Sequence, residues 1–87
     1  MTAKNLSGKR IKLARTNREM PQSELCEMLS QHDVEMTQNT LSNIERGTRI
    51  IRDVELAAFA QVLDVNPAWL LFGDKPPKFS DAPFKSK

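Results

Sequence analysis

Residues 37–47 constrain the fold more than any other stretch, because they combine a helix start, an apolar stripe and a helix stop within 11 positions. Thr37 is a favourable N-cap residue, and Gly47 suits the left-handed turn that ends many helices. Leu41 and Ile44 are three residues apart, so they lie on the same side of a helix. The stretch therefore predicts a short amphipathic helix with one buried side.

The other side of this predicted helix is polar but uncharged, whereas a helix kept only for solubility more often carries Glu and Lys. It presents Gln38, Asn39, Ser42 and Asn43. Amide side chains both donate and accept hydrogen bonds, and Asn and Gln can pair bidentately with adenine in the DNA major groove. For this helix alone, an ordinary solvated face is an equally good interpretation.

A second short helix is predicted immediately before it, from Pro21 to Leu29. Leu25 and Leu29 are four residues apart, and the small residue Cys26 next to Leu25 would allow another helix to cross closely. The pattern Gln-x-x-Leu-small-x-x-Leu, a turn, and Thr-x-x-x-Leu-Ser-x-Ile-Glu-x-Gly resembles the helix-turn-helix family of phage repressors and Cro proteins. The positions that match are Gln22, Leu25, Cys26, Leu29, Thr37, Leu41, Ser42, Ile44, Glu45 and Gly47.

The resemblance covers roughly residues 7–73, and the chain departs from the family pattern in two places. Pro21 stands where the family usually has a Ser or Thr cap, so the second helix has no side-chain N-cap. The connection over residues 30–36 is several residues longer than the usual tight turn, which affects the angle between the second and third helices.

The resemblance implies an all-α, five-helix, lambda-repressor-like DNA-binding domain over residues 5–73. The run that begins at Asp74 and contains Pro76 and Pro77 breaks regular structure, so a flexible or extended tail is expected over residues 74–87. Asn5 or Ser7 is expected to cap the first helix, with Ile11 and Ala14 facing inward. Asp53 is expected to cap the fourth helix. Asn66 and Pro67 are expected to start the fifth, which Gly73 ends.

The resemblance also assigns roles to individual residues. Base contacts are expected from Gln38, Asn39 and Asn43, with Thr40 and Ser42 as secondary candidates. Phosphate contacts are expected from Gln22, Arg15, Arg18, Arg46, Arg49 and Arg52. Arg10 and Glu45 match positions that form a partly buried ion pair in the family, so their expected role is structural.

The charge is distributed unevenly, although the net charge is only +2. Residues 1–18 carry +6, residues 19–35 carry −5, residues 36–52 carry +2, residues 53–74 carry −4 and residues 75–87 carry +3. The amide-bearing helix is thus flanked by basic segments, and the acids gather in the second helix and the C-terminal half, which fits cations near phosphates and acids on the far side. Ordinary solvated charge is the alternative interpretation.

The fifth predicted helix carries more large apolar side chains than one buried face accommodates. They are Trp69, Leu70, Leu71 and Phe72. One or two of them should be exposed in a monomer, which suggests a homodimer contact at this helix.

Enzyme chemistry finds no support in the sequence. His32 is the only histidine and has no neighbouring Cys or second His, so no metal site is expected, and no cofactor-binding motif occurs. Cys26 is the only cysteine, which excludes an internal disulfide, fits a reducing cytoplasm and favours a packing role for this residue. No segment is long and apolar enough for a membrane span, and we expect no signal peptide.

The sequence therefore predicts a sequence-specific transcriptional regulator, in its simplest form a repressor, with double-stranded DNA and a second copy of the chain as partners. The alternative is a DNA-binding antitoxin or an anti-repressor that binds a partner protein. In that case the fifth helix, or the tail with Phe79 and Phe84, would provide the contact.

Overall fold

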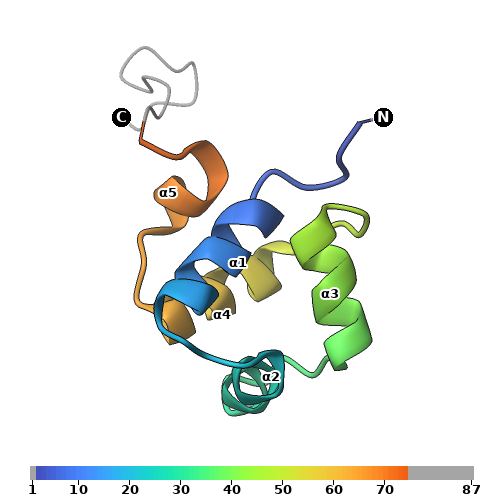
Figure 1. The fold of residues 1–87 in the computed structure, drawn as a ribbon, viewed down its shortest axis with the longest axis vertical. Helices are drawn as coiled ribbons and strands as arrows, with labels where there is room; N and C mark the ends of the chain where they lie inside the picture. The colour runs from blue at the N-terminus through green and yellow to red at the C-terminus, as the bar shows by residue number, and fades with distance from the viewer. Residues whose placement is uncertain (1, 75–87) are drawn as a thin grey trace, which may run out of the picture.

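The computed structural model describes residues 2–74, which form five α-helices and no strand. In chain order these are α1 (Gly8–Asn17), α2 (Gln22–Ser30), α3 (Gln38–Arg46), α4 (Asp53–Leu63) and α5 (Pro67–Phe72). Figure 1 shows α1 in front of α4, with α3 on one side, α5 on the other and α2 seen end-on below. The predicted all-α fold with five helices is confirmed. The predicted tail lies, from residue 75 onward, outside the described residues.

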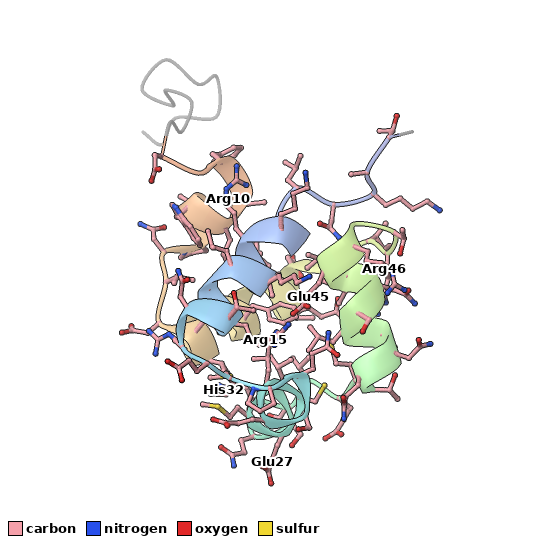
Figure 2. All side chains as sticks on the ribbon, viewed as in Figure 1. Arg10, Arg15, Glu27, His32, Glu45 and Arg46 are labelled. Carbon is pink, nitrogen blue, oxygen red and sulfur yellow. The ribbon has the colours of Figure 1, made fainter. Side chains whose placement is uncertain are left out.

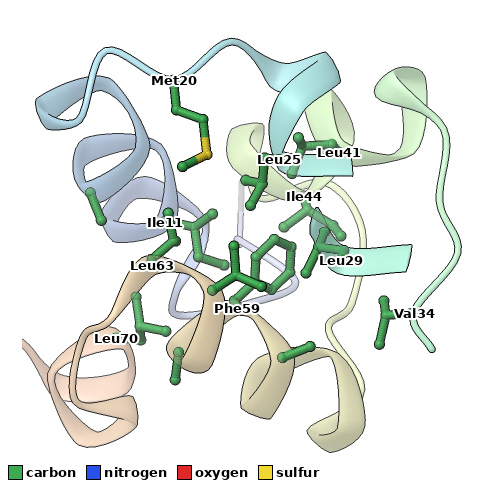
Figure 3. Packing of buried hydrophobic residues seen from close by; sticks show 14 residues of the cluster. Ile11, Met20, Leu25, Leu29, Val34, Leu41, Ile44, Phe59, Leu63 and Leu70 are labelled. Carbon is green, nitrogen blue, oxygen red and sulfur yellow. The ribbon is translucent and has the colours of Figure 1, made fainter. Parts of the chain in front are cut away.

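One hydrophobic core lies between the helices, and every helix contributes to it. Phe59 of α4 is fully buried and lies in the middle of the cluster, between Ile11 and Leu63 on one side and Leu29 and Ile44 on the other (Figure 3). Leu41 and Ile44 are both fully buried. The apolar side of α3 therefore faces inward as predicted, and its polar side is turned outward.

The helices α1 and α3 approach each other very closely at Gly8. A Cβ atom at this position would lie 2.0 Å from the carbonyl oxygen of Ile44, so the contact requires glycine. Asn5 fixes the same contact: its Oδ1 accepts from the Gly8 N–H at 2.7 Å, and its Nδ2 donates to the carbonyls of Ile44 at 3.1 Å and Arg49 at 2.8 Å. Of the two caps predicted for the first helix, Asn5 rather than Ser7 provides the hydrogen bond.

Four of the helices end in the same type of left-handed turn, and only one of these turns contains glycine. The residue with positive φ in each of these four turns is Glu19 at 53°, Asp33 at 65°, Gly47 at 80° and Asp64 at 55°. In each turn the next residue donates its N–H to a carbonyl five positions back: Met20 to Arg15, Val34 to Leu29, Thr48 to Asn43 and Val65 to Ala60. This is the Schellman arrangement, which satisfies the last carbonyls of a helix.

The longer connection between α2 and α3 adds to the core instead of disrupting it. Val34 follows the left-handed Asp33 and is buried in the core with 5% of its surface exposed, and Met36 packs against the same cluster.

As the sequence predicts, Pro21 precedes α2 without a side-chain cap, and Asn66 caps α5 by accepting from the Ala68 N–H at 2.7 Å.

One predicted helix start is wrong. The N-cap of α4 is Arg52, and Asp53 is the first helical residue. The backbone N–H of Arg52 donates to Oε1 of Glu55 at 3.0 Å, so the glutamate in the first turn of α4 satisfies the N–H of the N-cap residue, which is one half of a capping box. Within residues 2–74, no helix combines the length and the apolar character needed to cross a lipid bilayer.

Candidate nucleic-acid interface

The helix α3 has well-defined ends and presents its polar side to solvent. At its start Thr37 Oγ1 accepts from the Thr40 N–H at 3.1 Å, and at its end Gly47 adopts the left-handed conformation. Gln38 and Asn39 are exposed and make no side-chain hydrogen bond to any described residue. Their donors and acceptors are therefore available to a ligand.

The other three candidates for base contacts are held by neighbouring side chains. Asn43 is half-buried, and its Oδ1 accepts a hydrogen bond from Nη2 of Arg46. Thr40 Oγ1 accepts from the Thr37 hydroxyl at 3.1 Å, and the Ser42 hydroxyl donates to Oε1 of Gln22 at 3.2 Å.

A buried polar network joins α1, α2 and α3. Arg15 donates to both carboxylate oxygens of Glu45, from Nε at 2.7 Å and from Nη2 at 3.0 Å, and its Nη1 donates to the Met20 carbonyl at 2.8 Å. Gln22 adds a hydrogen bond from its Nε2 to Oε1 of Glu45 at 3.1 Å. The network thus fixes the start of α2 against α3, as Figure 2 shows for Arg15 and Glu45 between the helices.

The predicted ion pair between Arg10 and Glu45 is wrong, because Arg15 is the partner of Glu45. Arg10 instead donates from Nη1 to the carbonyls of Leu6 at 3.2 Å and Leu70 at 3.1 Å, on the side of α5 (Figure 2). Five residues of a helix correspond to a rotation of about 140°, so the two arginines point in different directions. Arg15 is buried in this pair with 9% of its surface exposed, so its predicted phosphate contact is also wrong.

The remaining candidate arginines differ in exposure. Arg18 and Arg46 are exposed, and the Arg52 side chain retains 63% of its accessible surface. Arg49 is half-buried, with 34% of its side chain exposed, and pairs with Glu55 at 3.0 Å.

Glu55, whose side chain is only 1% exposed, pairs with two of these arginines, and this role was not predicted from the sequence. A glutamate three residues after a helix N-cap is the available sequence signal, because it can close the first turn. Burial alone would raise the pKa of the Glu55 carboxyl. Hydrogen bonds from the Arg49 side chain and the Arg52 backbone and side chain, with the Arg49 charge, outweigh that effect and lower the pKa below its ordinary value.

A polar pocket of about 250 Å³ opens at the junction of α1, α2 and α3. Its lining residues are Lys12, Arg15, Gln22, Ser42, Glu45 and Arg46. Since Arg15 neutralises Glu45 inside the network, the exposed cations Lys12 and Arg46 dominate the charge at its mouth. The pocket lies at the N-terminal end of α2, where the helix dipole favours an anion.

Cys26 packs against the core, as predicted, and is half-buried. Burial and, to a smaller degree, the negative charge of Glu45 raise the pKa of its thiol. The thiol therefore stays protonated at neutral pH, which is the form suited to packing.

The apolar residues of α5 divide between the core and the surface. Leu70 is fully buried, so its predicted place in a dimer interface is wrong. Trp69, Leu71 and Phe72 are half-buried. Trp69 and Phe72 line an open groove of about 400 Å³ with Arg10, Leu13, Gly73 and Asp74, and the side chain of Leu13 on α1 adds an exposed apolar surface.

The comparisons with known proteins agree with this geometry. A model of the helix-turn-helix family matches residues 11–70. Among solved structures, the chain is similar to the P22 c2 repressor protein, crystallised with a synthetic operator in the presence of Tl⁺, at 27% identity and a TM-score of 0.68. That match covers 80% of this chain and 98% of the repressor chain. No curated protein sequence matches. The chain belongs to the helix-turn-helix family, with a domain of the phage-repressor type.

Proposed function

We propose that this chain is a sequence-specific DNA-binding transcriptional regulator that reads the major groove with α3. The observation that carries the proposal is the exposed amide pair Gln38 and Asn39, on a helix whose opposite side is fixed in the core. An α-helix fits the B-DNA major groove, where amides can pair with the edges of bases. The similar P22 c2 protein is a repressor, which supports repression as the form of regulation.

Asn43 would contact a base after it loses its hydrogen bond with Arg46. In the free chain Arg46 donates to Oδ1 of Asn43. Arg46 is exposed at the last position of α3, so it can turn to a phosphate and leave the Asn43 amide facing the groove. Thr40 and Ser42 remain secondary candidates, because their hydroxyls already bond to Thr37 and Gln22.

A phosphate is proposed to bind at the pocket between α1 and the start of α2. Its ligands would be Lys12, Gln22 and Arg46, which line the pocket. The amide nitrogen of Gln22 carries two hydrogens and donates to Glu45, so one hydrogen is left for a phosphate oxygen. Arg18 is a further candidate, because it is exposed just beyond the end of α1.

The active form is proposed to be a homodimer that binds a near-palindromic site. Trp69 and Phe72 of α5 line one groove with exposed Leu13 of α1, and the half-buried Leu71 adds apolar surface on the same short helix; these residues support the contact. A two-fold dimer would place two copies of α3 in successive major grooves, about 34 Å apart.

The function is tested by separating base contacts from phosphate contacts. Duplexes that bind the full chain are selected from a random pool, and affinity is then measured by fluorescence anisotropy on a selected and a random duplex. We expect Gln38→Ala and Asn43→Ala to cost about 1–3 kcal/mol on the selected duplex and little on random DNA. Arg46→Ala should weaken binding to both duplexes and reduce the salt dependence by about one unit.

Gln31→Ala is the matched control, because Gln31 is an exposed amide at the C-cap of α2 and does not belong to α3. It should bind both duplexes as the unmodified chain does. Equal losses on selected and random DNA for the Gln38 and Asn43 variants would disprove base reading by α3.

A further inference from the structure

We propose that Glu55 is a positioning residue for the DNA backbone contact, holding Arg52 as the phosphate-binding cation of the segment between α3 and α4. Arg49, by contrast, serves mainly to neutralise and anchor Glu55. This inference rests on the proposed DNA-binding function. It assigns different roles to Arg49 and Arg52, which were both predicted from the sequence as phosphate contacts.

The geometry around Glu55 is that of a buried acid held from two sides. Arg49 donates to both carboxylate oxygens, at 3.0 and 3.2 Å. Arg52 donates from its backbone N–H to Oε1 at 3.0 Å and from Nη2 to Oε2 at 3.2 Å. One carboxylate thereby fixes both the backbone and the side chain of Arg52, at the point where the chain enters α4.

The two arginines are placed very differently. Arg49 makes two bonds to Glu55 and a third to the Ile50 carbonyl at 3.0 Å, and its own carbonyl accepts from Asn5. Its side chain is two-thirds covered. Arg52 uses only one of its five guanidinium N–H groups on Glu55, and its side chain is 63% exposed. Arg52 is therefore the cation that can reach a phosphate while it remains attached to Glu55.

Glu55 is a buried carboxylate in the first turn of α4, paired with two arginines proposed as phosphate contacts, and its negative charge by itself would oppose the approach of phosphates. The arginines compensate that charge, leaving one net positive charge on the group of three. A free arginine loses much rotamer freedom when it binds a phosphate, and an arginine already held in place loses less. Positioning of this kind increases affinity even though it introduces an acid.

The Glu55→Gln substitution gives opposite results under the two explanations. If only charge mattered, removing an acid beside the DNA would tighten binding. If Glu55 positions Arg52, Glu55→Gln should weaken the affinity of the full chain for a random-sequence duplex about threefold to tenfold. Asp53→Asn is the matched control. Asp53 is exposed, it follows Arg52 directly, and its side chain makes no hydrogen bond within the described residues, so this variant should bind slightly tighter.

The single substitutions of Arg52 and Arg49 locate the effect without requiring that the Glu55→Gln variant folds, and a double-mutant cycle adds a second measure. Arg52→Gln should reduce the slope of log affinity against log salt by about one unit, whereas Arg49→Gln should leave the slope unchanged. In a double-mutant cycle, Arg52→Gln should cost less in the Glu55→Gln background than in the unmodified chain. Circular dichroism at the assay temperature confirms that each variant is folded.

The outcomes separate this inference from the proposed function. If the unmodified chain binds random DNA in a salt-dependent way but Glu55→Gln binds tighter, as Asp53→Asn does, the positioning role is disproved and DNA binding stands. Equal slope changes for the Arg49 and Arg52 variants disprove it as well. An unmodified chain with no salt-dependent affinity for DNA would overturn the proposed function and this inference with it.

Discussion

At the scale of single residues, two buried carboxylates decide which arginines are available to a nucleic acid. Glu45 holds Arg15 inside the domain, and Glu55 holds most of Arg49. Arg18 and Arg46 carry the same charge but remain exposed. The number of basic residues in a segment therefore overstates its capacity to bind phosphate, and the partner of each cation has to be known.

The Arg15–Glu45 pair should show strong energetic coupling. Glu45→Ala leaves a buried guanidinium without its carboxylate, and Arg15→Ala leaves a buried carboxylate without its guanidinium. Each variant should lose about 3–5 kcal/mol of unfolding free energy. The double variant should lose less than the sum of the two single losses in urea unfolding. The control cycle pairs Arg10→Ala with Glu45→Ala and should be additive. Additivity in both cycles would show that Arg15 and Glu45 do not interact.

Glu55 should make part of the stability dependent on acid pH. Its pKa is lowered in the folded chain, so its contribution is complete above the ordinary glutamate pKa of about 4.3 and is lost as the pH falls through the folded value. The stability difference between the unmodified chain and Glu55→Gln should therefore be constant near neutral pH and shrink in acid. Urea unfolding at a series of pH values measures it, and a difference that grows in acid would contradict the lowered pKa.

At the scale of elements, the end of α1 is strained, so a substitution that relieves the strain should raise the free energy of unfolding. Glu19 has a left-handed φ of 53°, a conformation that costs an L-residue about 1–2 kcal/mol, and glutamate lacks the short side chain that makes asparagine and aspartate tolerant of it. Because Met20 N–H bonds to Arg15 O and Met20 is buried, the surrounding structure holds Glu19 in this conformation.

Glu19→Gly should therefore stabilise the domain. We expect a gain of about 0.5–1 kcal/mol, since relief of the left-handed strain exceeds the added entropy of glycine in the unfolded chain. Glu27→Gly is the matched control: Glu27 is exposed in the middle of right-handed α2, and its replacement should cost about 1 kcal/mol. Thermal unfolding of the two variants should shift in opposite directions, and a shared direction would show that the strain at Glu19 is negligible.

The helices could be predicted from the sequence because their signals are local. The Thr37 and Asn66 caps and the stop at Gly47 each act within a few residues, and the structure confirms them. The wrong assignments concern tertiary contacts, in which a side chain of one helix packs against another helix that is distant in the sequence. Choosing Arg15 over Arg10 requires the rotation of α1 against α3, and the burial of Leu70 requires the docking of α5. Glu55 was missed because its partners are brought together by an irregular segment.

At the scale of the whole molecule, the short helix α5 both packs into the core and presents apolar side chains at the surface. Leu70 completes the core, and the Leu70 carbonyl accepts from Arg10 of α1, so the helix is firmly attached. Trp69, Leu71 and Phe72 remain half-buried at the surface. Because α5 is firmly attached to the domain, a dimer contact through these residues would hold the two domains in a fixed relative orientation.

Leu71→Glu should prevent dimer formation without unfolding the chain, because Leu71 is only half-buried. Losing the second subunit removes the gain from simultaneous binding, so affinity for a palindromic site should fall about a hundredfold. Gln61→Glu, the same charge change at an exposed position of α4, should have little effect. Sedimentation with and without DNA gives the stoichiometry. An unmodified chain that binds its best site strictly as a monomer would contradict the dimer and favour a different protein as the partner of α5.

The attachment of α3 has a consequence for how such a regulator can change its target. The helix is held by Leu41, Ile44 and the backbone carbonyl that Asn5 contacts, and Gln38 and Asn39 take no part in holding it. Substitutions at those two exposed positions therefore leave folding nearly untouched. If Gln38 and Asn39 read bases as proposed, single substitutions at these two positions change the preferred operator through folded variants, and the two positions form a suitable library for changing the specificity of the protein in the laboratory.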